Sequence, residues 1–166
     1  MNHALLRTRL TAAGNDVIST PEAGSPKAPD MRLANVSRAQ FLKHRILCVD
    51  DEIVGTTMRA EVLRQQGYSV DLYHSPVAAL RCDVSMFELA ILDFEMPELN
   101  GRELLLRLRA LGARFPIVLL TGRLEELSHE DRVLFARCLD KGMPSSRLLD
   151  VVTELLDQNT IPDYGS

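Results

Sequence analysis

The stretch that decides the fold is AILDFEMPELNG, residues 90–101. Its first three residues are apolar, as in a strand that is covered on both faces, and the run ends on an acid, Asp93. The pair Met96-Pro97 then indicates a sharp turn. A carboxylate at the end of a buried strand costs free energy unless it has partners. Asp93 therefore indicates that polar or charged partners come from elsewhere in the chain.

Short apolar runs alternate with amphipathic segments from residue 45 onward. The runs predict strands, and the segments between and after them predict helices. The expected strands are 46–49, 68–73, 88–93, 116–120 and 137–140, and the expected helices are about 54–66, a short one from 75–76, 101–111, 124–135 and 146–157. This alternation predicts an α/β fold, a flavodoxin-like doubly wound parallel sheet of five strands in the order 2-1-3-4-5 with five helices.

Two of the expected helices carry local signals of their own. In the helix near 54–66 we expect Val54, Met58 and Val62 to share one apolar face. For the helix at 101–111, Asn100 is a suitable N-terminal cap, and Gly112 a suitable end.

Composition limits the class of protein. Of the 166 residues, 46% are hydrophobic and 25% are charged, which is typical of a globular protein with a core. No apolar stretch approaches the roughly 18 residues of a membrane span. Residues 1–45 contain seven Lys or Arg and three acids, whereas the remainder contains 12 basic and 20 acidic residues. An acidic globular part argues against nucleic acid as a direct ligand.

The ends of the chain differ from its middle in composition. Residues 12–30 mix Gly, Pro, Ser and Ala without a helical or strand period. We predict a flexible tail over 1–43, one domain over 44–160 and a short tail over 161–166. The first residues lack the apolar run of an export signal, so we expect none, and the three cysteines lack CxxC spacing. We therefore expect a cytoplasmic protein with reduced thiols.

In a sheet of this kind, ligands bind beyond the carboxyl ends of the strands. Polar residues stand at four of these ends, namely Asp50-Asp51-Glu52, Asp93, Thr121 and Asp140-Lys141. The clustered carboxylates would repel one another unless a cation lay between them. A small number of hard oxygen ligands that are open to water suits Mg²⁺, because this ion keeps several of its bound waters. A carboxylate nucleophile, Mg²⁺, a lysine and a hydroxyl are together sufficient for phosphoryl transfer.

Four segments carry a resemblance to a known family. They are ILCVDDE (46–52), ILDFEMPELNG (91–101), PIVLLTG (116–122) and CLDKG (138–142). In this order, at the ends of successive strands, they resemble the CheY-like receiver domains of two-component response regulators. The resemblance covers residues 45–158.

The resemblance implies a role for each of these polar residues. Asp93 would accept the phosphoryl group, Thr121 would hydrogen-bond to the phosphoryl oxygens, and Lys141 would pair with the phosphate. The implied ligands of Mg²⁺ are Asp51, Asp50 (partly through water), Asp93 and the backbone carbonyl of Glu95. The protein would be no enzyme beyond taking up this phosphoryl group and slowly losing it.

The resemblance also implies partners. The donor would be a phosphohistidine on a sensor histidine kinase or a histidine phosphotransfer protein. A downstream protein would read the phosphorylated state, and a homodimer could form through the face made by 124–135, 137–140 and 146–157. The chain ends within ten residues of its last predicted helix, so we expect a stand-alone response regulator.

Two positions depart from the family pattern. Gly142 follows the lysine where proline is usual, and Cys138 stands where an aromatic residue usually reports phosphorylation. These departures favour an alternative, a pseudo-receiver that serves as an interaction module with weak or no phosphorylation. A second alternative is a haloacid-dehalogenase-like phosphatase. That family requires an Asp two residues after its nucleophile, where this chain has Glu95.

Overall fold

The computed structural model describes residues 43–159. The predicted tails lie outside this range, except that residue 43 begins the first strand. The strands are β1 (Lys43–Val49), β2 (Tyr68–Tyr73), β3 (Leu89–Asp93), β4 (Ile117–Thr121) and β5 (Arg137–Asp140). All neighbours pair in parallel in the order β2-β1-β3-β4-β5. The predicted fold class and strand order are confirmed.

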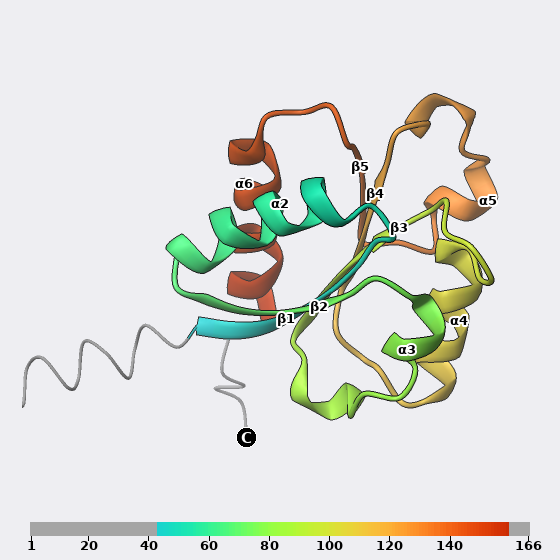
Figure 1. The fold of residues 1–166 in the computed structure, drawn as a ribbon, viewed down its shortest axis with the longest axis horizontal. Helices are drawn as coiled ribbons and strands as arrows, with labels where there is room; N and C mark the ends of the chain where they lie inside the picture. Colours follow the sequence, from blue (N-terminus) through green and yellow to red (C-terminus); the bar gives the residue numbers. More distant parts are fainter. Residues whose placement is uncertain (1–42, 160–166) are drawn as a thin grey trace, which may run out of the picture.

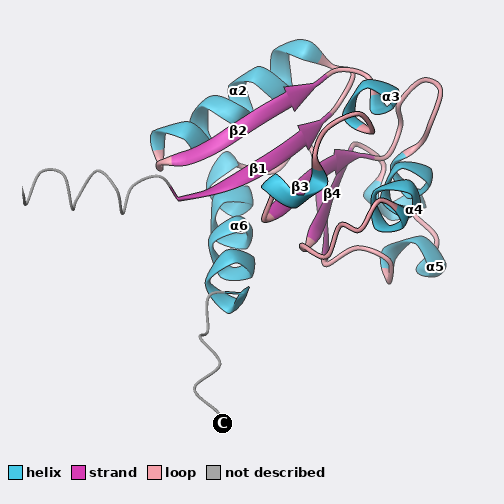
Figure 2. Cartoon of the chain, turned by 90° about the horizontal axis from the view of Figure 1, so that it is seen from below, coloured by secondary structure: helices cyan, strands magenta, loops and turns pink. Residues whose placement is uncertain are grey.

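Helices cover both faces of the sheet. They are α2 (Ile53–Gln65), α3 (Pro76–Ala79), α4 (Gly101–Ala110), α5 (His129–Arg132) and α6 (Ser145–Asn159), joined by the short 3₁₀ turns η1 (Val84–Met86) and η2 (Leu124–Glu126). Helices α2 and α6 lie on one face, and α3, α4 and α5 lie on the other (Figures 1 and 2). In the part of the chain that the structure describes, no helix is long and apolar enough to cross a membrane.

Each face of the sheet has its own apolar core, because successive side chains of a strand point to opposite sides. Under α2 and α6 the core includes Ile46, Cys48, Ala60, Leu63, Ile91, Val118, Val152 and Leu156. On the other face it includes Leu47, Val49, Leu92, Leu104, Leu108, Ile117, Leu119 and Phe135. Strands β3 and β4 are buried along their whole length, and their last residues, Asp93 and Thr121, are the only polar ones within these two strands.

Helix α4 has the ends that the sequence predicts. The Asn100 side chain accepts a hydrogen bond from the backbone N–H of Glu103, and the Glu103 side chain accepts one from the backbone N–H of Asn100. This reciprocal capping box satisfies two backbone donors at the start of the helix. The helix stops before Gly112, whose φ of +97° lies in the left-handed region that favours glycine.

The prediction for the inner face of α2 is wrong. Thr56, Ala60 and Leu63 are the buried residues of this helix, whereas Val54 and Met58 are 69% and 66% exposed. Two of these three residues are small, and the hydroxyl of Thr56 is satisfied because it donates to the Glu52 carbonyl at 2.7 Å. Hydrophobicity therefore does not mark the inner face of this helix.

The helix predicted over 124–135 is divided into two short pieces. Leu127, buried and extended (φ −69°, ψ 127°), separates η2 from α5. The Ser128 side chain then caps α5 by accepting a hydrogen bond from the backbone N–H of Asp131. A strong N-cap in the middle of the predicted helix thus begins a new one.

Helix α4 begins directly against the end of β3. The backbone N–H of Gly101 donates to the Phe94 carbonyl at 2.9 Å. A Cβ atom on Gly101 would lie 2.4 Å from the carbonyl oxygen of Asp93 and 3.0 Å from Cα of Phe94. Because both neighbours are backbone atoms, only a shift of the chain at Asp93 could make room.

We expect Gly101→Ala to lower the free energy of unfolding by about 1–3 kcal/mol, the usual range for overpacking. Urea denaturation of the two proteins would measure the change. Gly122→Ala is the matched control, since a Cβ atom there meets no heavy atom within 4 Å. Equal losses in the two variants would contradict the close contact at Asp93.

Candidate functional site

The predicted polar residues meet at the carboxyl edge of the sheet. Asp50 directly follows β1 and Asp93 ends β3, and each is only 4% exposed. Thr121 ends β4 and is fully buried, while Lys141 directly follows β5. These four side chains come from four neighbouring strands, and the parallel topology therefore brings them together.

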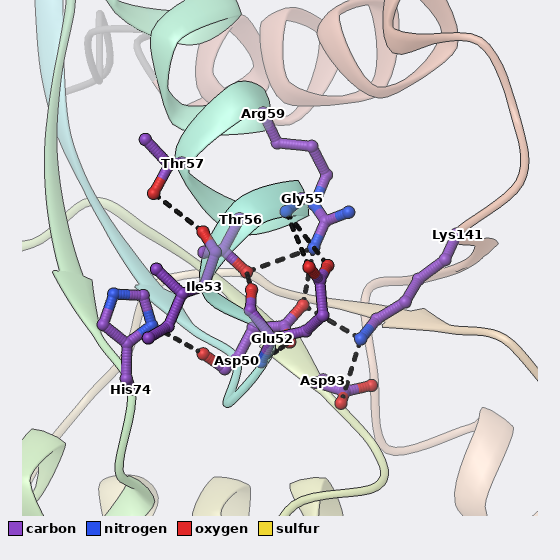
Figure 3. A network of polar contacts seen from close by, with 10 residues as sticks. All are labelled: Asp50, Glu52, Ile53, Gly55, Thr56, Thr57, Arg59, His74, Asp93 and Lys141. Carbon is purple, nitrogen blue, oxygen red and sulfur yellow. Dashed lines mark hydrogen bonds and ion pairs between the residues drawn. The ribbon is translucent and has the colours of Figure 1, made fainter.

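Lys141 joins the two buried carboxylates. Its Nζ lies 3.0 Å from Oδ2 of Asp50 and 3.0 Å from Oδ2 of Asp93 (Figure 3). Burial alone would lower the pKa of Lys141, but the hydrogen bonds with Asp50 and Asp93 raise that pKa above its ordinary value. The ammonium group is therefore held in its charged form between two acids.

The pKa of Asp93 is shifted by opposing effects. Burial raises the pKa of Asp93 above its ordinary value, and the hydrogen bonds from Lys141 and from the backbone N–H of Glu95 oppose this rise without cancelling it. Its carboxylate is therefore incompletely stabilised by the protein. A further positive charge at this edge of the sheet would therefore stabilise the ionised form of Asp93.

Three carboxylates here form a group that fits a metal ion. One oxygen each from Asp50, Asp51 and Asp93 lie within 4.8 Å of one another. Asp51 is exposed, so the group is buried on one side and open to water on the other. A small set of oxygen donors with access to water is what Mg²⁺ requires. The donor chemistry therefore fits the predicted magnesium site.

The loop after β1 fixes the carboxylate of Asp50 in place. Oδ1 of Asp50 accepts the backbone N–H of Glu52 at 2.9 Å, and the Asp50 carbonyl accepts Nδ1 of His74 at 3.0 Å (Figure 3). Oε1 and Oε2 of Glu52 in turn accept the backbone N–H of Gly55, which caps α2. The acidic run after β1 therefore serves both as a helix cap and as part of the site.

Thr121 and Glu95 lie beside the cluster. The hydroxyl of Thr121 accepts the backbone N–H of Arg123 at 3.1 Å, and its carbonyl accepts the backbone N–H of Lys141 at 2.9 Å. The Glu95 side chain is exposed and pairs with Nη1 of Arg123 at 3.2 Å. The role predicted for the Glu95 carbonyl in binding metal stays a prediction.

The two positions that depart from the family pattern have defined contacts. The backbone N–H of Gly142 donates to Oδ1 of Asp140 at 2.6 Å, which turns the chain sharply after the lysine. Cys138 is half-buried in β5, and its thiol donates to the carbonyl of Arg132 at 3.7 Å. Lys141 thus reaches both acids without a proline at 142.

Sequence reasoning missed one residue of the site. Arg59 of α2 places Nη2 2.6 Å from Oδ2 of Asp50 and 3.2 Å from the hydroxyl of Thr56 (Figure 3). Arg59 is three residues after Thr56 and one before Ala60, which both face the sheet, but no hydrophobic pattern in the sequence marks this face of α2.

Taken together, the edge holds a buried carboxylate, a lysine, a hydroxyl and a group of acids that fits Mg²⁺. The comparisons with known proteins agree with this chemistry. Residues 46–153 match the model of the response regulator receiver domain family. A solved structure, the response regulator TrrA of Thermotoga maritima in complex with Mg²⁺-BeF, is similar with a TM-score of 0.59 and 30% identity, over 68% of this chain and 98% of that one.

Curated relatives are similar over the same region. The transcriptional regulatory protein CpxR homolog of Haemophilus influenzae is 30% identical over 71% of this chain and 52% of its own length. The sensor histidine kinase RcsC of Salmonella typhimurium is 31% identical over 68% of this chain and 11% of its own length. The chain thus spans about half the length of the first relative and a smaller share of the second. On the family match and these similarities, the chain belongs to the response regulator receiver domain family.

Proposed function

We propose that this chain accepts a phosphoryl group on Asp93 from a phosphohistidine donor and signals by binding a protein partner. The observation that carries the proposal is Lys141, whose Nζ contacts both buried acids at 3.0 Å. The similarity to a response regulator in complex with Mg²⁺-BeF supports it. The donor would be a sensor histidine kinase or a histidine phosphotransfer protein.

The proposed step is a displacement at phosphorus. One carboxylate oxygen of Asp93 attacks the phosphorus atom as the bond to the imidazole nitrogen of the donor breaks. That nitrogen keeps the electron pair of the broken bond. Lys141 neutralises charge on the phosphoryl oxygens, and the Thr121 hydroxyl donates a hydrogen bond to one of them. Mg²⁺, held by Asp50, Asp51, Asp93 and the carbonyl of Glu95, would neutralise the remaining charge.

The setting of this function also belongs to the proposal. We place the protein in the cytoplasm, in accord with Cys48, Cys82 and Cys138, which are free. Its stand-alone status stays a prediction of the sequence. A homodimer through α5, β5 and α6 and a separate output partner also stay predictions.

A pseudo-receiver is the second candidate, and Cys138 is the observation that favours it. A half-buried thiol bonded to the Arg132 carbonyl cannot sweep the volume of an aromatic ring. Under this alternative the same surface would bind its partner regardless of phosphorylation. Uptake of a phosphoryl group on Asp93 distinguishes the two candidates.

We expect acetyl phosphate with Mg²⁺ to add one phosphoryl group to the protein, and Asp93→Ala to abolish the addition, because the nucleophile is then absent. Intact-mass spectrometry would measure both. Asp150→Ala, which removes an exposed acid of α6, should retain the addition. An unmodified wild-type protein that also fails to bind beryllofluoride with Mg²⁺ would decide for the pseudo-receiver. Sustained turnover of phosphate esters would indicate a phosphatase instead.

We expect Lys141→Met to destabilise the metal-free protein by about 1–3 kcal/mol, since it leaves two buried acids without one of their cations. This range is discounted for the partial exposure of Lys141. Urea denaturation in EDTA would measure the loss, and added Mg²⁺ should recover part of it. Arg147→Met, which removes an exposed charge from α6, is the control and should leave stability within about 0.5 kcal/mol. Equal losses in the two variants would refute the bridging role of Lys141.

The pKa of Asp93 predicts a further dependence on pH. Because its folded pKa is raised above the unfolded value, ionisation of Asp93 removes stability as the pH rises through the interval between the two values. Asp93→Asn lacks this cost, so it should melt at a higher temperature than wild type at pH 7 in EDTA. The difference should shrink on acidification below that interval. Calorimetry at the two pH values would measure the melting temperatures, with Asp157→Asn, which replaces an exposed acid of α6, as the control. A melting temperature of Asp93→Asn below that of wild type at pH 7 would contradict the raised pKa of Asp93.

A further inference from the structure

A second cation reaches the acidic cluster from α2. Arg59 donates through Nη2 to Oδ2 of Asp50 at 2.6 Å, and the same oxygen accepts Nζ of Lys141 at 3.0 Å (Figure 3). The side chains of Arg59 and Asp50 are 18% and 6% exposed. A short hydrogen bond between two charged and poorly hydrated groups is a strong one.

The first turn of α2 is shaped around this guanidinium. A Cβ atom on Gly55 would lie 3.0 Å from Nη1 of Arg59 and 2.2 Å from Oε2 of Glu52. The Thr56 hydroxyl accepts Nη2 of Arg59 at 3.2 Å. Glycine inside a helix is less favourable than alanine, and here it leaves room for the Glu52 carboxylate and for the Arg59 guanidinium. Gly55 and Thr56 thus support the position of Arg59.

The contacts of Asp50 have a consequence for a metal ion. Oδ1 of Asp50 accepts the Glu52 N–H, and Oδ2 accepts both Arg59 and Lys141. Both oxygens of this acid are therefore engaged before any metal arrives. A divalent cation that binds Asp50 must displace one of these donors or share an oxygen with it at close range, where like charges repel.

We propose that Arg59 is a positioning residue that holds Asp50 in the metal-free state and thereby lowers the affinity of the site for Mg²⁺. The inference rests on the magnesium site of the proposed function. Because binding free energies are reciprocal, Mg²⁺ weakens the contact between Arg59 and Asp50 as much as that contact weakens Mg²⁺ binding. Half-occupancy of the site then requires a higher Mg²⁺ concentration than the three acids alone would require.

Titration calorimetry with Mg²⁺ at constant ionic strength tests the inference. We expect Arg59→Met to bind Mg²⁺ about tenfold more tightly than wild type, because the substitution removes a like charge that lies close to the metal site. Arg59→Lys, which keeps the charge, should lie closer to wild type. Arg64→Met is the matched control, because it removes the same charge from the same helix at a residue that bonds the Val70 carbonyl instead.

The melting temperature provides a second readout. In EDTA, Arg59→Met should melt below wild type, and saturating Mg²⁺ should narrow the difference, because the metal replaces the lost cation at Asp50. A purely structural arginine would lower the melting temperature equally with and without Mg²⁺. Arg59→Gln, which keeps a donor but no charge, serves the same purpose if Arg59→Met does not fold.

Three results would overturn the inference. Equal or weaker Mg²⁺ binding by Arg59→Met would do so while leaving the proposed function intact. An equal gain in Arg64→Met would assign the effect to net charge alone. No Mg²⁺ binding by wild type or any variant would overturn both this inference and the magnesium site of the proposed function.

Discussion

Asp50 and Asp93 lie side by side at the end of a buried sheet, and their mutual repulsion requires positive charges beside them. Two unit charges about 5 Å apart interact by about 3 kcal/mol at an effective dielectric constant near 20. That energy is a large fraction of the stability of an ordinary domain. Lys141 and Arg59 offset it from opposite sides, one from the end of β5 and one from α2. The two acids cannot separate, because β1 and β3 are direct neighbours with Val49 paired to Leu92.

Much of this arrangement could be predicted from the sequence. Continuous apolar runs such as 88–93 indicate strands covered on both faces, and they alternate with helical segments, which leaves few topologies. Once the strand order is known, the residues at the carboxyl ends must share an edge. Asp50, Asp93, Thr121 and Lys141 were therefore predictable as neighbours without any knowledge of their side-chain conformations.

The inner face of α2 and the position of Arg59 could not be predicted, because they depend on features that hydrophobic periodicity does not encode. Thr56 and Ala60 face the sheet although they are less apolar than Val54 and Met58, which are exposed. The choice depends on how closely the helix can approach the sheet, and this is a property of the packed molecule. Arg59 was missed for the same reason. The division of the predicted helix 124–135 has a different cause. Ser128 is a typical N-cap residue and could be recognised in the sequence, but a single continuous helix was predicted across it.

The hydrogen bond from the backbone N–H of Lys141 to the Thr121 carbonyl joins the ends of β4 and β5. It ties the last residue of β4 to the residue that follows β5, so neither main chain can shift alone without losing this bond. The contact is made by backbone atoms only and does not involve the side chain at position 138. A thiol in place of an aromatic ring at Cys138 therefore leaves this connection between the two strands in place.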